Sequence, residues 1–316
     1  MFSASPEGWS GTDIPDQSDR TFVVTGANSG IGFEITKALA RAGGDVVMAC
    51  RSLDRGTTAR DEITRSVPDA SLTVCELDLA DSSSIESFAN SFLSAFDRLD
   101  VLINNAGVMW TPYSTTADGF ERQFGVNHLG HFALSGLLLD RLRESDGESR
   151  IVTQSSIAHA QGRIDFTGRD WPAAYNRQAA YARSKLANLL FTYELDRRLR
   201  AVGSSTIGVA SHPGLTESGL ITGDTETETP WLRAAIGAPI VGLFAQPASD
   251  GALPALYAAT ASSVDGGQYI GPDGFKALWG NPTHVVSSER SYDPELARQL
   301  WTHSEAQTGV SFGLET

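Results

Sequence analysis

The chain has 316 residues, of which 38 are acidic and 24 basic, so its formal net charge is −14 at pH 7. This length fits one large domain or two small ones, and a hydrophobic content of 41% excludes wholesale disorder. The acidic surplus argues against nucleic acid as the main partner, because such a partner needs a large lysine and arginine cluster that this sequence lacks.

Strand-like and helix-like segments alternate from residue 21 onward. Residues 21–25 form a short apolar run bounded by glycine, which predicts a buried strand. Apolar residues then recur at helical spacing over residues 31–42, and Gly43 and Gly44 are expected to end that helix. This first unit has the order of a strand followed directly by a helix.

The alternation continues along the chain. An amphipathic helix is predicted over residues 85–96, and a capping box of Ser83 and Glu86 is expected to open it. Further strands are predicted at 45–49, 72–77, 100–103, 150–155 and 206–211, with helices around 119–143 and 179–201.

Strict alternation of strands and helices predicts a parallel sheet with helices on both faces. The predicted fold is α/β, a doubly wound Rossmann-type parallel sheet in a single domain. Residues 1–18 are expected to form a flexible tail, and residues 19–316 the domain itself. The pattern breaks at 215–247, where a polar stretch precedes an apolar one. We expect this segment to be a substrate lid; the alternative is a surface excursion without a role.

A glycine-rich turn lies between the first predicted strand and helix. The segment Thr25-Gly26-Ala27-Asn28-Ser29-Gly30-Ile31-Gly32 has glycines at the spacing GxxxGxG. Glycines let the backbone turn tightly and approach a pyrophosphate, whose charge then lies at a helix N-terminus. The turn therefore predicts dinucleotide binding, although its spacing differs from the commoner GxGxxG.

Arg51 follows the second predicted strand, where NAD-preferring sites place a carboxylate that binds the ribose 2′-hydroxyl. A carboxylate would repel a 2′-phosphate, whereas Arg51 attracts one. The sequence thus favours NADP(H) over NAD(H). The alternative is that Arg51 only caps the edge of the strand.

Tyr181 and Lys185 are four residues apart on a predicted helix, and so share one face. A free phenol has a pKa near 10, which is too high for an effective proton donor and acceptor at neutral pH. A neighbouring ammonium favours the phenolate, so we expect Lys185 to lower the pKa of Tyr181.

Together these motifs resemble the short-chain dehydrogenase/reductase family. The resemblance rests on the glycine turn, the segment Asn104-Asn105-Ala106-Gly107, and Ser156 ahead of Tyr181 and Lys185, and it covers nearly the whole chain. The closest branch is the retinol-dehydrogenase-like and WW-domain-oxidoreductase-like one. Its features here are Ala49-Cys50-Arg51, Asn127-His-Leu-Gly-His131, Ser184-Lys-Leu-Ala-Asn188 and His212-Pro213-Gly214.

The resemblance implies a role for each matching residue. Tyr181 matches the general acid and base, Lys185 the lysine that binds the nicotinamide ribose, and Ser156 the serine that hydrogen-bonds the substrate oxygen. Asn127 matches the asparagine that holds a water in the proton relay. The implied cofactor contacts are Gly26, Asn28, Ser29, Gly30, Ile31, Gly32, Arg51, Asp78, Leu79, Asn105, Ala106, Gly107, Tyr181, Lys185, Pro213, Gly214 and Ser218.

Two positions need a choice. Ser155 and Ser156 are adjacent and point to opposite faces of a strand, and Ser156 is the one that matches the family pattern. Ser218 stands where the family usually has threonine, so the resemblance implies that a hydroxyl is retained at the position that contacts the carboxamide. A loop over about residues 159–178 lengthens the interval between Ser156 and Tyr181 and is expected to border the substrate.

The predicted function is NADP(H)-dependent interconversion of an alcohol and an aldehyde or ketone, on a hydrophobic substrate. Two alternatives stay open: a non-catalytic NADP-responsive binding protein, and an enone or double-bond reductase of the same family. His128, His131, His159 and His212 lack metal-ligand spacing, so no metal is expected and structural or surface roles are assigned to them. The resemblance leaves a homodimer or homotetramer possible.

Cysteine use and hydropathy indicate the compartment. Cys50 and Cys75 are too few to staple a domain of this size, which favours a reducing, cytoplasmic setting. No apolar stretch reaches the length of a transmembrane segment, and the first 19 residues lack the features of a secretory signal. Only three of the 24 basic residues are lysines, a bias typical of either a halophile or a GC-rich genome.

Overall fold

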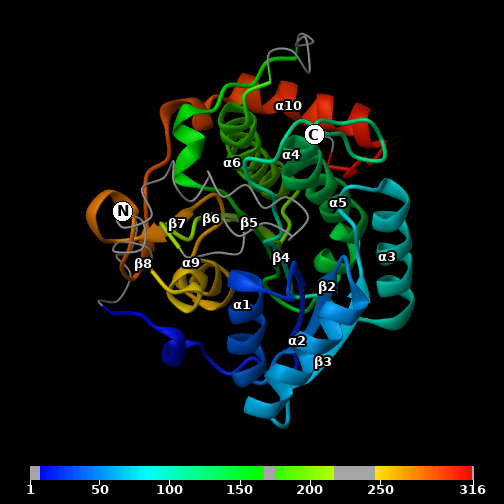
Figure 1. Cartoon of the computed structure of the whole chain (residues 1–316), viewed down its shortest axis with the longest axis vertical. Helices are drawn as coiled ribbons and strands as arrows, with labels where there is room; N and C mark the ends of the chain where they lie inside the picture. The colour runs from blue at the N-terminus through cyan, green and yellow to red at the C-terminus, as the bar shows by residue number, and fades with distance from the viewer. Residues whose placement is uncertain (1–7, 167–174, 217–245, 315–316) are drawn as a thin grey trace.

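The computed structural model describes residues 8–166, 175–216 and 246–314. These residues form an eight-stranded sheet and the helices around it, and the strand order is β3-β2-β1-β4-β5-β6-β7-β8 (Figure 1). Neighbouring strands from β3 to β7 are parallel, and β8 is antiparallel to β7. The strands are β1 Thr21–Thr25, β2 Asp45–Cys50, β3 Ser71–Glu76, β4 Val101–Asn104, β5 Arg150–Gln154, β6 Ile207–Ser211, β7 Tyr269–Pro272 and β8 Pro282–His284.

Helices cover both faces of this sheet. Side chains alternate along β1, so Phe22 and Val24 pack with α1, α2 and α9, whereas Val23 packs with α3, α5 and α6. This arrangement confirms the predicted single α/β domain with a doubly wound sheet. The helices are α1 Gly30–Arg41, α2 Leu53–Ser66, α3 Ser82–Ala95, α4 Arg122–Phe124, α5 Gly130–Arg143, α6 Arg177–Ala201, α9 Ala248–Thr260 and α10 Pro294–Thr308.

The helix α6 is held between the sheet and α10. In Figure 1, α10 (red) lies beside α6 on the side away from the sheet. Leu300 of α10 packs against Leu186 and Leu190 of α6, and the Trp301 ring stacks on Phe191 at a centroid distance of 5.9 Å. Apolar packing on two sides explains why a helix with no single apolar stripe is buried along most of its length.

Two predicted helix starts were wrong. The helix α3 begins at Ser82, one residue before the predicted capping box, because the Asp81 carboxylate accepts the backbone N–H of Ser83 at 2.9 Å. The segment predicted as helical from 119 begins only at Arg122 and passes through one π-helical turn, Gly125–Leu129, before α5. The helix α2 was not predicted, because its buried positions are only Gly56, Ala59 and Ile63.

The residues before β1 pack against the domain from at least Trp9 onward, unlike the flexible tail expected there. The Trp9 ring is buried and meets the Tyr257 ring edge-on at 5.1 Å. Further along, the backbone N–H of Gln17 donates to the carbonyl of Ala42. Burying an indole is worth enough free energy to order a short segment.

Two kinds of feature are absent from residues 8–166, 175–216 and 246–314. No helix in those ranges is long and apolar enough to cross a membrane. The same ranges hold no group of three or more histidine, cysteine or acidic side chains arranged to bind a metal ion.

Candidate active site

A cavity of about 680 Å³ lies at the carboxyl ends of the parallel strands, between the glycine-rich turn and α6. This is the edge at which doubly wound sheets bind ligands. Of the residues expected at the site, the cavity is lined by Gly26, Asn28, Ser29, Gly30, Ile31, Gly32, Arg51, Asp78, Leu79, Asn105, Ala106, Gly107, Tyr181, Lys185 and Pro213. Gly214, Asn127 and Ser156 lie close by without lining it, and Ser218 lies outside the described residues.

The glycine-rich turn is shaped to receive a phosphate. Gly26 and Gly30 have φ angles of +67° and +53°, a region that disfavours side chains. A Cβ atom on Gly32 would lie 2.2 Å from the carbonyl oxygen of Gly26, so the helix can approach the turn only with glycine there. Ser29 is the N-cap of α1 and makes no side-chain capping bond in the described structure, so the first N–H groups of α1 can serve an anion.

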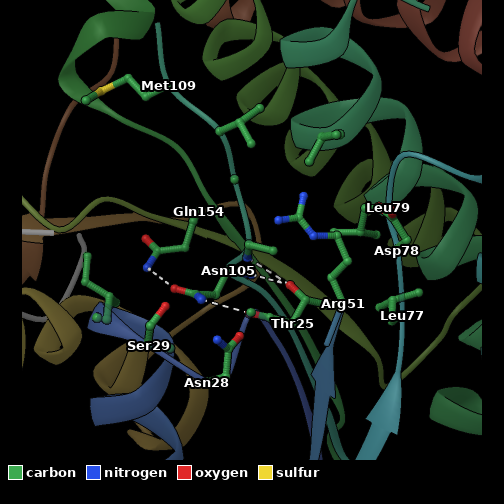
Figure 2. A pocket seen from close by; sticks show the side chains of 18 of the residues that line it. Thr25, Asn28, Ser29, Arg51, Leu77, Asp78, Leu79, Asn105, Met109 and Gln154 are labelled. Atoms are coloured by element: carbon green, nitrogen blue, oxygen red, sulfur yellow. Dashed lines mark hydrogen bonds between the residues drawn. The ribbon is translucent and has the colours of Figure 1, made fainter. Parts of the chain in front are cut away.

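One end of the cavity is cationic. Arg51 follows β2, and both it and Arg55 on the first turn of α2 line the cavity together with Ser52. Figure 2 shows the Arg51 side chain extending from the end of its strand toward Leu79. Two guanidinium groups at this end suit a phosphate ester better than a bare ribose hydroxyl.

The floor of the cavity is held by Thr25. Its hydroxyl Oγ1 accepts the backbone N–H groups of Asn105 (3.0 Å) and Ala106 (2.9 Å), and the Asn105 amide Nδ2 donates to the Thr25 carbonyl (2.8 Å; Figure 2). These bonds fix the segment after β4 against the end of β1. The chain thereby presents Ala106 and Gly107 along the cavity in a fixed position.

Tyr181 and Lys185 lie together at the other end of the cavity. Both are on one face of α6, and only 7% of Tyr181 and 3% of Lys185 is exposed. The Lys185 Nζ lies 5.7 Å from the centre of the Tyr181 ring and donates to the carbonyl of Gln154 at 3.1 Å. The Ser156 side chain lies close enough to the Tyr181 phenol to lower its pKa. Ser156, Tyr181 and Lys185 thus lie close together. The spacing on the helix predicts the proximity of Tyr181 and Lys185, and the family resemblance implies that of Ser156.

The two adjacent serines have different environments. Ser155 Oγ donates to the carbonyl of Lys185 at 2.8 Å, so its hydroxyl is engaged in holding α6 against β5. Ser156 is the N-cap of a short 3₁₀ helix, Ile157–Gln161, and its Oγ accepts the N–H of Ala158. The Ser155 residue contributes to the cavity wall, but only the Ser156 hydroxyl lies beside the Tyr181 phenol.

Asn127 lies within the π-helical turn. Its Oδ1 accepts the N–H of Val108 (2.8 Å), and its Nδ2 donates to the Val108 carbonyl and to Ser184 Oγ (both 2.9 Å). A Cβ atom added to Gly107 would lie 3.2 Å from Asn127 Oδ1 and 3.7 Å from Lys185 Nζ. Asn127 therefore ties the segment after β4 to α6 next to the lysine.

Burial, rather than the lysine, dominates the acidity of the tyrosine. It raises the pKa of Tyr181 to about 12, and the neighbouring Ser156 side chain offsets only part of that rise. Burial also lowers the pKa of Lys185 to about 8. Burial therefore outweighs the lowering expected from Lys185, and Tyr181 is a protonated phenol at neutral pH.

Some residues of this site were missed in the sequence. Gln154 lines the cavity and receives Lys185 on its backbone carbonyl, and His131 contacts Thr25 from below. No motif marks Gln154, because its contribution is a backbone oxygen at the end of β5. The position of Thr25 at the head of the glycine motif could have indicated its role.

The two ends of segment 217–245 meet beside the cavity. Thr216 and Gln246 form a parallel bridge, and the Gln246 side chain donates to the carbonyl of Pro213, which lines the cavity. The predicted lid thus leaves and returns at the wall of the site, while its interior lies outside the described residues.

Comparison with known proteins agrees with this geometry. Residues 20–229 match the family model for short chain dehydrogenases. The human retinol dehydrogenases 13 and 11 are each 42% identical to the chain, covering 92% and 89% of it and 85% and 83% of their own lengths. A crystal structure of an uncharacterized protein from Mycobacterium paratuberculosis has 40% identity and a TM-score of 0.78, covering 96% of this chain and 99% of its own.

More distant structures share the fold. A short chain dehydrogenase from Shigella flexneri complexed with NADP has 21% identity and a TM-score of 0.61, covering 81% of this chain and 98% of its own. One from Burkholderia phymatum in complex with NAD has 20% identity and the same TM-score, covering 77% and 86%. The chain belongs to the short-chain dehydrogenase/reductase family, is similar to its retinol dehydrogenases, and is an oxidoreductase that interconverts alcohols and carbonyls with NAD(P)(H).

Proposed function

We propose that this enzyme uses NADP(H) to interconvert a hydrophobic alcohol and its aldehyde or ketone, with Ser156, Tyr181 and Lys185 at the reacting centre. One observation carries the proposal: a single cavity runs from the glycine turn and Arg51 to Tyr181 and Lys185. The first turn of α1 would hold the pyrophosphate of a dinucleotide, and the same cavity would let the cofactor reach the phenol.

The residues around the cavity fit each part of such a cofactor. Arg51 and Arg55 would hold the 2′-phosphate, and Asp78 and Leu79 the adenine. Lys185 would hold the nicotinamide ribose. When bound, the nicotinamide supplies the hydride for reduction or accepts it in oxidation.

The chain's own groups handle the proton and the substrate oxygen. In reduction, the protonated Tyr181 phenol donates its proton to the carbonyl oxygen as charge develops there. The Ser156 hydroxyl hydrogen-bonds that same oxygen and fixes its position. In oxidation, Tyr181 must start as the phenolate, which the neighbouring Lys185 ammonium favours. The phenolate then accepts the proton of the alcohol and becomes the phenol. Asn127 holds the segment after β4 against α6 beside Lys185, through its hydrogen bonds to Val108 and Ser184.

The hydrophobic substrate is proposed from the lid segment. Its ends meet at Pro213, so it can cover the nicotinamide end of the cavity, and its sequence from 231 to 244 is apolar. Relatives named retinol dehydrogenases support an apolar alcohol or aldehyde. A reducing, cytoplasmic setting is supported by Cys50 and Cys75, which remain unlinked thiols.

The test combines binding with turnover. Thermal shifts with NADPH and with NADH rank the two nucleotides, and nucleotide oxidation is then followed with alkyl aldehydes, retinal, ketones and enones. We expect a larger shift with NADPH and turnover of long-chain aldehydes or ketones. Nucleotide binding without turnover of any carbonyl would contradict the proposal, as would turnover confined to enones.

A further inference from the structure

His159 is a buried residue that holds the backbone carbonyl of Ser156. Its backbone N–H and its ring Nδ1 both reach the carbonyl oxygen of Ser156, at 3.0 Å and 2.6 Å. On its other side, ring Nε2 lies 3.0 Å from the backbone N–H of Ser288. The ring is buried and meets Tyr269 edge-on at 5.6 Å.

The partners of the His159 ring fix its protonation. The Ser288 N–H can only donate, so Nε2 must be the accepting nitrogen. The proton of the neutral ring is then on Nδ1, where it donates to the Ser156 carbonyl. Burial lowers the pKa of His159, in keeping with a neutral ring. The imidazole thus has a defined donor side and a defined acceptor side.

The two contacts from His159 to the Ser156 carbonyl determine where the Ser156 hydroxyl lies. The backbone N–H and the ring Nδ1 of His159 both hold the Ser156 carbonyl. They fix the plane of the Ser156–Ile157 peptide, which is attached to the Cα that carries the Ser156 hydroxyl. The backbone of Ser156 is extended (φ −161°, ψ 155°), and its Oγ accepts the Ala158 N–H at 3.2 Å. A rotation of this peptide would move the hydroxyl away from Tyr181.

The acceptor side of His159 connects the serine to the C-terminal segment. Arg290 lies two residues after Ser288, and its guanidinium donates to the Gly162 carbonyl at 2.6 Å. Gly162 directly follows the 3₁₀ helix that Ser156 caps. Ser287 is bonded to the hydroxyl of Tyr193 on α6, three turns beyond Tyr181. One short segment therefore fixes both the loop that carries Ser156 and the helix that carries Tyr181.

We propose that His159 is a positioning residue for the reaction, whose Nδ1–H donor holds Ser156 so that its hydroxyl meets Tyr181 and the substrate oxygen. This inference rests on the proposed roles of Ser156 and Tyr181. It replaces the purely structural or surface role assigned to His159 from the sequence. The Ser288 contact orients the ring, and the Ser156 contact transmits that orientation to the site.

Two substitutions separate the two sides of the ring. In His159→Asn, the amide nitrogen takes the place of Nδ1 and can donate to Ser156, but nothing reaches Ser288. In His159→Gln, the amide oxygen takes the place of Nε2 and can accept from Ser288, but the donor to Ser156 is lost. The same two substitutions at His303 on α10 serve as matched controls, because His303 contacts Phe166 and lies outside the cavity lining.

The readouts are kcat and KM for nonanal with NADPH, the NADPH dissociation constant, and crystal structures of both His159 variants. We expect kcat of His159→Gln to fall at least tenfold with NADPH affinity unchanged, and His159→Asn to stay within about threefold of the parent. Ser156 Oγ should stay beside the Tyr181 phenol in the Asn variant and lie away from it in the Gln variant.

Other outcomes overturn the proposal. Equal kcat in the two His159 variants, whether normal or reduced, would show that the Nδ1 donor does not position Ser156. An unchanged contact between Ser156 and Tyr181 in the Gln variant would do the same. If the parent enzyme reduces no carbonyl, the proposed function fails, and the crystal structures still decide the role of His159 by themselves.

Discussion

The Nε2 atom of His131 lies 2.9 Å from the hydroxyl Oγ1 of Thr25, in the interior below the glycine-rich turn. The Asn127 carbonyl lies 3.1 Å from His131 Nδ1 and can only accept, so Nδ1 is the donating nitrogen of the ring. Nε2 is then the nitrogen that accepts from the Thr25 hydroxyl, whose oxygen accepts two backbone N–H groups. Burial lowers the pKa of His131 to about 4, so the ring is neutral. One polar chain thus links the nucleotide turn to the π-helical turn.

Replacing Thr25 with valine is expected to break that chain without changing the volume of the side chain. Two buried N–H groups and His131 Nε2 would lose their partner, so we expect the free energy of unfolding to fall by about 2–4 kcal/mol. NADPH should also bind at least tenfold more weakly, because Asn105 and Ala106 line the cavity. Denaturant titration measures the free energy of unfolding, and calorimetry measures the NADPH affinity. Thr25→Ser is the control that keeps the hydroxyl. A stable Thr25→Val protein with normal affinity would refute this account.

Removing the phenol hydroxyl tests the proton donor directly. Tyr181→Phe should lower kcat by about 10²–10⁴-fold, because the phenol hydroxyl is the group proposed to give its proton to the substrate oxygen. NADPH affinity should change by less than about threefold, because Lys185 and the glycine turn remain. Steady-state kinetics and nucleotide titration make the comparison, with Tyr113→Phe, which lies outside the cavity lining, as the control. Near-normal turnover in Tyr181→Phe would remove the assignment.

Much of this fold could be predicted because its signals are local. A strand such as β1 has an uninterrupted apolar run, and the glycine turn joins it to α1 at a spacing that phosphate binding requires. The pairing of Tyr181 with Lys185 could be predicted from their helical spacing, whereas Ser156 could be placed only by resemblance. The helix α2 had no comparable signal, since it buries mainly Gly56 and Ala59 and is otherwise polar.

Other properties depend on the assembled structure. The pKa of Tyr181 follows from how completely α6 is buried, and that burial comes partly from α10, which lies over a hundred residues away in the sequence. The spacing of Tyr181 and Lys185 predicts their proximity but not their desolvation. In the same way, the role proposed for His159 depends on Ser288, a partner that no local pattern links to it.

The cationic end of the cavity predicts the choice of nucleotide. Arg51→Asp should weaken NADPH binding by about 10- to 100-fold and leave NADH binding equal or tighter, because a carboxylate repels the 2′-phosphate and accepts from a ribose hydroxyl. Calorimetric titration with both nucleotides gives the ratio of the NADPH and NADH dissociation constants. Arg41→Asp on α1 makes the same change of net charge away from the cavity lining and should leave the ratio unchanged. An equal loss for both nucleotides in Arg51→Asp would argue against a 2′-phosphate site.

Lys185 should make the nucleotide-free protein less stable than it would be with an apolar side chain. Its ammonium is buried, and its pKa falls from 10.5 to about 8 on folding. At neutral pH both folded and unfolded chains hold the proton, so the full cost of burying the charge is present. Lys185→Met is therefore expected to raise the free energy of unfolding by about 1–3 kcal/mol at pH 7, while lowering kcat and NADPH affinity.

The pH dependence of this gain has a definite sign. As pH rises through about 8, folded Lys185 releases its proton, whereas the unfolded chain keeps it until about 10.5. The unfolded state then binds more protons than the folded state, so the stability of the parent rises across this window and the advantage of Lys185→Met shrinks. Denaturant titrations of both proteins between pH 7 and 10.5 follow the difference. A constant difference over that range would mean that Lys185 is neutral or solvated in the folded protein.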